Sequence, residues 1–449
     1  MYSLKDLHFE IPENVTYILD TLNHLGFEAF AVGGCIRDVI LGKEPQDWDI
    51  TTSAKPEQIK RIFPKTFDTG IEHGTITVLL NHCGYEVTTY RIDGEYKDGR
   101  HPEEVIFTSN LTEDLKRRDF TINAMAYNPR IGIVDEFGGI DDLNQGIIRC
   151  VGNAKERFKE DALRILRAIR FSAQLGFEIE EQTYQGIREL KENLIHVSKE
   201  RIQVELTKTI CSNHPENLRL CYETGVSKII MPWFDRMMEM EQHNPYHAFS
   251  VGEHSLRVVQ NIESIPFLRW AALLHDVAKP LCQTRDKDGI DHFYGHQQKG
   301  KEEAKNILLD LRFDNKTIRY VTRLVACHDM SPELTEEGIR WNIYQIGEDL
   351  YPYFLKLKRA DASGKNRMVQ KEVFQEIDAM EQLYRVILEK KCCLSMKNLA
   401  VTGNDLIEAG IPQGPSIGKI LKTLLEQVVE EPERNKKEEL LAIAKEIRV

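Results

Sequence analysis

The hydrophobic pattern of this chain changes at about residue 154. Before that point, short apolar runs with strand character, such as 76–80 and 85–90, alternate with helical segments. Beyond it, strand signals nearly vanish and apolar residues recur at helical spacing, as over 162–169 and 440–447. This switch predicts a mixed-sheet α/β head followed by an elongated all-α body.

Local signals add elements and boundaries to this outline. The periodicity of residues 1–25 predicts a helix closed by Gly26, and 105–107 and 120–127 have strand character. Proline and glycine clusters, the first at Pro232 and the others at 243–245 and 410–418, indicate breaks between helical units. We expect four parts: a head over 1–150, a helical neck over 151–235, a helical domain over 236–370 and a C-terminal body over 371–449.

The composition limits the classes of function. The chain has 449 residues, 41% of them hydrophobic and 29% charged, which is ordinary for a soluble protein, and no apolar run approaches a membrane span. Nine scattered cysteines without a C-x-x-C pair, and an N-terminus without a signal pattern, predict reduced thiols in the cytoplasm. With a net charge of −12, an RNA partner would have to meet a local basic surface. We expect neither a membrane nor a DNA partner.

The first stretch with chemical meaning follows the apolar run 30–32, which predicts a short buried strand. Gly33 and Gly34 end that strand and a helical pattern follows, so backbone N–H groups at the helix start can face a phosphate. Arg37, one turn into the helix, adds a guanidinium for phosphate oxygens. Asp47 and Asp49 alternate, so on a strand both carboxylates face one side, where two Mg²⁺ ions would neutralise them. For the glycines alone, a surface turn is the alternative.

Two charged segments follow. The first, 90–102, is polar and contains glycine, which suits either a mobile loop beside an active site or an ordinary hairpin loop. The second carries Lys116, Arg117 and Arg118 at a predicted helix end, just before a strand. These cations could meet phosphate or ribose, or could balance the helix dipole.

A later helix combines acidic and basic side chains. Asp161 and Arg164 are i,i+3 neighbours there, and Arg167 and Arg170 continue the spacing on a helix with a full apolar stripe. Part of this spiral must approach the buried side, where arginine is uncommon unless it is paired or holds a ligand. A carboxylate beside a guanidinium matches the amine and ring nitrogen of cytosine and adenine, and it mismatches uracil and guanine. An exposed intrahelical ion pair is the alternative.

As an ordered set, four motifs resemble those of one family. Gly-Gly-x-x-Arg-Asp, Asp-x-Asp, Arg-Arg-Asp-Phe-Thr-Ile-Asn-Ala and Glu-Asp-x-x-Arg-x-x-Arg-Ala are similar to those of the class II tRNA nucleotidyltransferases, the CCA-adding enzymes. These enzymes are relatives of bacterial poly(A) polymerases in the polymerase-β-like superfamily. The resemblance covers roughly residues 20–235, and 399–414 resembles the family's tail more weakly.

The resemblance implies a polymerase-β-like head and a set of residue roles. Asp47 and Asp49 would hold two Mg²⁺ ions, and the loop over 90–102 goes with addition of the final A in this family. Glu86 is a candidate third carboxylate. The remaining implied roles are triphosphate contact by Gly34 and Arg37, nucleotide contact by Arg118, choice of C then A by Asp161 with Arg164, and support of that pocket by Arg167 and Arg170.

The second half contains its own histidine and aspartate set. An adjacent His275-Asp276 follows an apolar helical run, with further histidines and an aspartate on later helices. Such ligands suit a transition ion or Mg²⁺ between helices, and the region resembles the HD phosphohydrolase superfamily. Taken singly, each histidine is more simply a core or surface residue. The predicted ligands are His254, His275, Asp276 and Asp361, with His296 and His328 in the same set and His243 and His247 outside it.

The leading hypothesis is template-independent addition of CCA to tRNA 3′ ends from CTP and ATP, dependent on Mg²⁺. Two alternatives of the same class are an enzyme that adds only the terminal A and a poly(A) polymerase. An alternative of another class is an HD phosphohydrolase whose head binds RNA.

Overall fold

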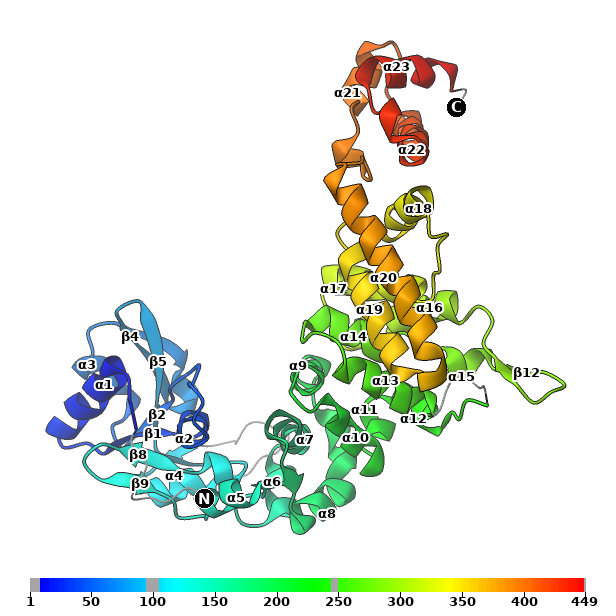
Figure 1. Cartoon of the computed structure of the whole chain (residues 1–449). Coiled ribbons are helices and arrows are strands. Elements are labelled where there is room, and N and C mark those ends of the chain that lie inside the picture. The colour runs from blue at the N-terminus through cyan, green and yellow to red at the C-terminus, as the bar shows by residue number, and fades with distance from the viewer. Residues whose placement is uncertain (1–8, 94–104, 244–248, 448–449) are drawn as a thin grey trace. The chain divides into compact units, whose positions relative to one another are not determined.

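The computed structural model describes residues 9–93, 105–243 and 249–447 (Figure 1). The chain divides into two compact units, the first ending at Pro232 and the second beginning at Trp233. Among the described residues, no helix has both the length and the hydrophobicity that crossing a membrane requires. The finer division into four parts stays a prediction.

A seven-stranded mixed sheet forms the head, coloured blue to cyan in Figure 1. Its strand order is β3-β4-β5-β2-β1-β8-β9, in which only the β2–β5 pair is parallel, while β6 and β7 form a separate antiparallel pair. The strands are β1 (Ala29–Val32), β2 (Ile50–Thr52), β3 (Thr66–Gly70), β4 (Thr75–Leu80), β5 (Cys83–Thr89), β6 (Arg91–Asp93), β7 (Val105–Phe107), β8 (Ala126–Asn128) and β9 (Gly132–Val134).

The centre of the sheet lies in the head's core. All four residues of β1 are buried, and Phe30 and Val32 pack in one cluster with Leu115 and Ala126. Helix α1 (Glu13–His24) buries one face, and the chain leaves it through Gly26, whose φ of +85° is the left-handed conformation predicted for that glycine. The predicted strands over 76–80, 85–90 and 105–107 are confirmed as β4, β5 and β7.

The predicted strand over 120–127 is wrong in its first half. Residues Thr121–Asn123 form a 3-10 turn, and β8 begins only at Ala126. The turn forms because side chains stabilise it: Thr121 Oγ1 donates to Asp142 Oδ2 (2.6 Å), and Asn123 Nδ2 donates to Asp119 Oδ1 (3.2 Å). Local side-chain hydrogen bonds thus replace the sheet pairing that the apolar pattern predicted.

Short helices surround the sheet and longer ones follow it. The predicted helix over 162–169 is confirmed as part of α7, which packs against α9, so the change of pattern at about residue 154 marks a change of architecture. A small parallel pair, β10 (Ile147–Ile148) with β11 (Glu178–Ile179), lies among these helices. The other helices of the first unit are α2 (Gly34–Ile40), α3 (Pro56–Ile62), α4 (Leu111–Lys116), α5 (Gly139–Gln145), α6 (Ala154–Glu160), α7 (Leu163–Leu175), α8 (Glu181–Leu190), α9 (Lys199–Ile210), α10 (Arg219–Glu223) and α11 (Ser227–Ile230).

Over the part of the second unit that the structure describes, the regular elements are helices apart from one short hairpin, as predicted for the body. The break predicted at Pro232 is confirmed because α12 begins there. The break predicted over 410–418 is also confirmed, because α21 ends at Glu408 and α22 begins at Pro415, although Gly418 itself lies inside α22. Its elements are α12 (Pro232–Glu239), α13 (Val251–Gln260), α14 (Pro266–Leu274), α15 (Lys279–Cys282), β12 (Thr284–Arg285), β13 (Asp291–His292), α16 (His296–Asp310), α17 (Asn315–Cys327), α18 (Glu336–Ile346), α19 (Tyr351–Gly364), α20 (Arg367–Glu389), α21 (Gly403–Glu408), α22 (Pro415–Glu430) and α23 (Lys437–Glu446).

Two groups of helices pack separately within this unit. Helices α13, α14, α16, α17 and α19 pack around fully buried side chains such as Trp270 and Phe354. A second core joins α22 and α23 through Leu424, Val428 and Leu440, which confirms the helix predicted over 440–447. The first of these groups carries the histidine and aspartate set.

Candidate functional site

Three carboxylates lie together at the start of β2. Asp47 and Asp49 precede the strand instead of lying on it, which corrects the prediction, but Asp49 adjoins Ile50, whose β5 partner is Val87. This parallel register places Glu86 of β5 beside Asp49. Burial raises the pKa of Glu86, and the charges of Asp49 and Asp47 raise it further. The three groups therefore act as one negatively charged cluster.

The pKa of Asp49 responds to the same cluster. Asp49 is exposed, but the surrounding protein partly desolvates its carboxylate, which raises the pKa. The positive charge of Arg118 lowers the pKa of Asp49, and the negative charge of Asp47 raises it. Carboxylates that repel one another in this way are the donor set that a divalent cation neutralises, so the residues fit Mg²⁺.

The predicted strand, glycine turn and helix are confirmed beside this cluster. Gly33 connects β1 to α2 with φ +85°, and a Cβ built on it would lie 3.1 Å from Arg118 Nη1. The backbone conformation favours glycine there, and a Cβ would also crowd the arginine side chain. Gly34 begins α2, and Arg37 extends from it to donate to Asn123 Oδ1 (2.8 Å) while pairing with Asp38 (2.8 Å).

A buried aspartate, which the sequence reasoning did not assign a role, connects the head to α7. Asp119 Oδ1 accepts from the backbone N–H of Phe120 and from Asn123 Nδ2, and its Oδ2 accepts from Arg167 Nε at 2.7 Å. Burial opposes ionisation of Asp119, but Arg167 and Arg164 outweigh it and lower its pKa to about 2. The sequence marked this residue only as part of the Arg-Arg-Asp-Phe-Thr-Ile-Asn-Ala motif, without a role of its own.

Phe171 of α7 gathers three guanidinium groups over its ring. Arg37, Arg167 and Arg170 lie 5.1, 5.4 and 4.0 Å from the ring centroid, and the phenylalanine itself is buried. Since Arg37 comes from α2, the predicted phosphate-contacting and nucleotide-selecting segments meet here.

Asp161 and Arg164 do not form the predicted pair on one helix face. Helix α6 ends at Glu160, Asp161 has an extended backbone, and α7 begins at Leu163. The Asp161 carboxylate accepts from Leu163 N (3.0 Å) and pairs with Arg201 Nη2 (2.8 Å) of α9. The helix breaks because this aspartate supplies the acceptor that the first turn of α7 needs, as an N-cap residue does.

Arg164 is held by other groups. Its Nη1 pairs with Glu160 Oε2 (2.5 Å) and donates to Arg157 O (3.2 Å), and its Nη2 donates to Arg117 O (2.8 Å). These contacts fix the guanidinium through three of its five N–H groups. The carboxylate of Asp161 likewise retains acceptor capacity beyond its two contacts, so both side chains can still recognise a base.

Arg170 has a structural partner. It pairs with Glu205 of α9 at 2.6 Å, both side chains are buried, and burial lowers the pKa of Arg170. The sequence had no signal for Glu205, or for Arg201, because both lie on α9, a separate helix.

The three basic residues Lys116, Arg117 and Arg118 have different surroundings. Lys116 ends α4 as predicted, and Arg117 pairs with the buried Asp114 at 2.8 Å, a partner that neither interpretation of the sequence included. Arg118 is 3.4 Å from the same aspartate and faces Gly33. Of the predicted loop over 90–102, residues 94–102 lie outside the described residues.

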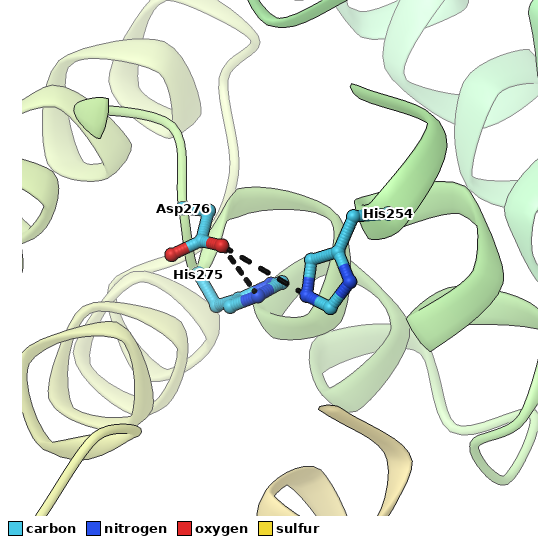
Figure 2. Close-up of side chains that lie close together, drawn as sticks. All are labelled: His254, His275 and Asp276. Atoms are coloured by element: carbon cyan, nitrogen blue, oxygen red, sulfur yellow. Dashed lines mark ion pairs between the residues drawn. The ribbon is translucent and has the colours of Figure 1, made fainter. Parts of the chain in front are cut away.

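The second unit brings the predicted histidines and aspartates together. His254 lies on α13, His275 and Asp276 directly follow α14, and Asp361 lies on α19. His254 Nε2 is 2.9 Å from Asp361 Oδ1, and His275 Nε2 is 3.1 Å from Asp276 Oδ2. Figure 2 shows the Asp276 carboxylate facing both imidazole rings. All four are buried.

Two further histidines complete this cluster. His296 begins α16 and His328 follows α17, and their Nε2 atoms lie 3.5 and 3.6 Å from Asp276 Oδ1. The cluster borders a cavity of about 300 Å³, which Lys279 and Lys365 also line. His243 interacts instead with Asp291, in agreement with its exclusion from the ligands, and His247 lies outside the described residues.

Family models match three parts of the chain. A poly A polymerase head domain matches residues 29–149, and a probable RNA- and SrmB-binding site of polymerase A matches 176–238. A putative tRNA nucleotidyltransferase domain 2 matches 292–444. The first match covers the sheet and its carboxylates, and the last covers much of the second unit.

Proteins similar to this chain over almost its whole length are CCA-adding enzymes. The chain is 36% identical over 437 residues to the CCA-adding enzyme of Lacticaseibacillus paracasei and 34% identical over 428 residues to that of Levilactobacillus brevis, covering 95% of each relative and 96% and 95% of this chain. It is also similar to the crystal structure of the Bacillus stearothermophilus CCA-adding enzyme in complex with CTP, with a TM-score of 0.68, 30% identity and 96% of both chains covered. This chain belongs to the CCA-adding enzyme family of nucleotidyltransferases.

Proposed function

We propose that this protein adds CCA to the 3′ end of tRNA from CTP and ATP, without a template. The observation that carries the proposal is the connection, within the first unit, between the carboxylate cluster and the start of α7. The charge of Arg118 acts on Asp49 of the cluster. Arg37, at the start of α2, is connected through Asn123 and Asp119 to Arg167 of α7. These contacts support the proposal because they link the segment that would receive the triphosphate to the helix that would help to select the base.

Asp47 and Asp49, with Glu86 as a third carboxylate, would hold Mg²⁺ in the head. Bound Mg²⁺ would activate the primer 3′-hydroxyl and stabilise the departing pyrophosphate. The support for Mg²⁺ is the all-oxygen donor set and its mutual repulsion. Gly34 and Arg37 would receive the triphosphate, and Arg118 would contact the nucleotide.

Asp161 and Arg164 would select the base. The carboxylate accepts a hydrogen bond from the exocyclic amine of cytosine or adenine, and the guanidinium donates to the adjacent ring nitrogen. Uracil and guanine present a carbonyl oxygen where the amine would be, so Asp161 would face another acceptor. Arg201, Glu160 and the Arg117 carbonyl hold the two side chains in place, and Arg167 and Arg170 support the same helix.

An incorporation assay tests the proposal. A tRNA lacking its terminus is incubated with labelled CTP, with labelled ATP and with both, in Mg²⁺. CCA addition requires C incorporation from CTP alone and a terminal A once both are present. Failure to incorporate either nucleotide would overturn the proposal. Incorporation of A only after a supplied CC end would indicate an A-adding enzyme, and long A tails would indicate a poly(A) polymerase.

The remaining alternative, a phosphohydrolase whose head only binds RNA, is separated by two variants. Incorporation must disappear in Asp47→Ala and persist in Asp276→Ala, since the two residues lie in different units. We place the reaction in the cytoplasm, with tRNA bound through its phosphates and shape.

A further inference from the structure

Two arginines from α6 and α7 close the C-terminal end of α4. Arg157 Nη1 donates to the carbonyl oxygen of Lys116 (3.0 Å), and Arg164 Nη2 donates to that of Arg117 (2.8 Å). These carbonyls lie where the regular backbone hydrogen bonds of the helix stop. The end of α4 is therefore held by side chains that follow it by 41 and 47 residues in the chain.

Glu160 joins the two arginines to each other. Its Oε1 lies 2.5 Å from Arg157 Nη2, and its Oε2 lies 2.5 Å from Arg164 Nη1. None of the three side chains is more than 23% exposed, so these charge-assisted bonds are only partly screened by solvent. The three side chains, with the carbonyl groups of Lys116 and Arg117, form a closed set that we call the α4 bracket.

The α4 bracket connects two residues of the candidate site. Arg164 is the guanidinium that would read the base. Arg118, which faces Gly33 and whose charge acts on Asp49, follows Arg117 directly in the chain. Since Arg164 donates to the carbonyl oxygen of Arg117, it is bonded to the peptide group that leads into Arg118. The bracket thus fixes the base-reading guanidinium relative to the segment that would contact the rest of the nucleotide.

Arg157 takes part in this arrangement through its backbone and its side chain. Its carbonyl oxygen accepts from Asp161 N (3.3 Å) and from Arg164 Nη1 (3.2 Å). Substitution of the side chain leaves these backbone bonds but removes the donor to Lys116 O and the partner of Glu160 Oε1. Glu160 and the end of α4 then each lose one restraint, and Arg164, which is bonded to both, can follow them.

We propose that Arg157 is a positioning residue for base selection, which holds Arg164 in place relative to Arg118 without touching the nucleotide. This inference rests on the proposed role of Asp161 and Arg164 in reading the base. A displaced guanidinium loses its hydrogen bond to the ring nitrogen of cytosine. It also no longer faces the N–H that uracil carries at that position, so binding of cytosine weakens while rejection of uracil is relaxed.

Selectivity of transfer tests the proposal. Arg157→Met keeps much of the aliphatic stem and removes the guanidinium. Single-turnover incorporation from CTP and from UTP into tRNA lacking its terminus should show the preference for CTP reduced about 10-fold or more. A loss of folded protein alone would lower both rates equally and leave their ratio unchanged. Arg157→Lys, whose ammonium can still reach one of the two partners, should recover part of the preference.

Lys155→Met is the matched control. Lys155 is a basic residue of the same helix and pairs with the exposed Glu189 at 2.6 Å, so its variant should keep the wild-type preference. Combining Arg157→Met with Arg164→Met should give the selectivity of Arg164→Met alone, because Arg157 acts through Arg164.

Equilibrium dialysis with labelled CTP and UTP measures selection without transfer. The ratio of the two dissociation constants should fall in Arg157→Met and remain unchanged in Lys155→Met. A wild-type ratio in folded Arg157→Met, or a further loss of selectivity when it is added to Arg164→Met, would overturn the positioning role. If unfolding midpoints show that Arg157→Met does not fold, Arg157→Lys decides, with an expected loss of about 3-fold. A wild type that binds CTP selectively but transfers no nucleotide would overturn the proposed function alone.

Discussion

The two candidate sites of this protein differ in how far the chain completes them. In the head, Asp47 and Asp49 are exposed, and they and Glu86 interact with one another mainly by repulsion. In the second unit, Asp276 and Asp361 are buried and each has a histidine and a lysine within 3.1 Å. The head carboxylates thus mainly repel one another, whereas each buried aspartate of the second unit lies beside a lysine that offsets its charge.

This difference predicts different consequences of substitution. Removal of an exposed carboxylate that repels its neighbours costs function and little stability. Removal of one partner from a buried charged pair leaves the other charge uncompensated and costs stability first.

The largest effect is expected for the head. Asp49→Asn should lower nucleotide incorporation by about 10⁴-fold, since the carboxylate would hold the ions that stabilise the transition state. The unfolding midpoint should not fall, because the substitution also removes repulsion with Asp47 and Glu86. Single-turnover incorporation and thermal unfolding check both statements. The control, Asp68→Asn, changes an exposed carboxylate of β3 and should leave both unchanged. A strong loss of stability in Asp49→Asn would contradict the comparison.

In the second unit the opposite pattern is expected. Asp276→Asn should lower the free energy of unfolding by about 4 kcal/mol in metal-free buffer, because buried Lys279 loses its counter-charge. Nucleotide incorporation below the unfolding transition should persist. Urea titration measures the stability, and Asp286→Asn, which breaks an exposed pair with His292, serves as control with a change under about 1 kcal/mol. If Asp276→Asn and the control were equally stable, the two sites would not differ in how much their carboxylates contribute to stability.

The neck offers a third case, a buried pair inside the first unit. Glu205→Gln should cost about 3 kcal/mol of unfolding free energy, because Arg170 is buried and burial already disfavours its charge. Glu189→Gln is the control, since Glu189 pairs with Lys155 in solvent and should contribute about 0.5 kcal/mol. Chemical denaturation of the two variants compares them. A loss no larger than that of the control would show that the Arg170 guanidinium is compensated by other groups.

The ionisation of Asp119 should make the free energy of unfolding depend on pH. Its pKa falls from 3.8 to about 2 on folding, so the folded state is favoured by about 2 kcal/mol above pH ~4, and this stability is lost as the pH falls toward 2. Asp119→Asn should remove that acid-range dependence. Unfolding free energies between pH 5 and 2 measure it, and Asp20→Asn, in an exposed pair with Arg130, should leave the profile unchanged. If the unfolding free energy of Asp119→Asn depended on pH as that of the wild type does, the stabilising interaction of Asp119 with Arg167 would be contradicted.

The sequence predicted elements, and which side chains gather together, more reliably than individual contacts. The α/β head, the helical remainder, the glycine turn and the histidine and aspartate set followed from periodicity and motif order, because these are local properties of the chain. The Asp161–Arg164 pair failed because helical spacing assumes an unbroken helix. Here the aspartate side chain caps the next helix and breaks the first.

Contacts between segments distant in the chain had no local signal. Arg201 and Glu205 come from α9, and Asp119 reaches Arg167 across 48 residues. Periodicity predicts which side of α7 is buried, but the partner of each buried arginine depends on tertiary packing. The position of Asp276 between two groups of histidines likewise depends on how helices distant in the chain pack together.

The central claim is that the head transfers a nucleotide and that Asp161 with Arg164 chooses it. Single-turnover incorporation from CTP, ATP, UTP and GTP into tRNA lacking its terminus measures this directly for the wild type, Asp161→Asn and the exposed control Asp141→Asn. The amide of Asn can donate to the carbonyl oxygen of uracil, so Asp161→Asn should retain transfer but reduce the preference for CTP over UTP by about 100-fold. The control should select as the wild type does. An Asp161→Asn protein that transfers nucleotides with unchanged selectivity would contradict the account.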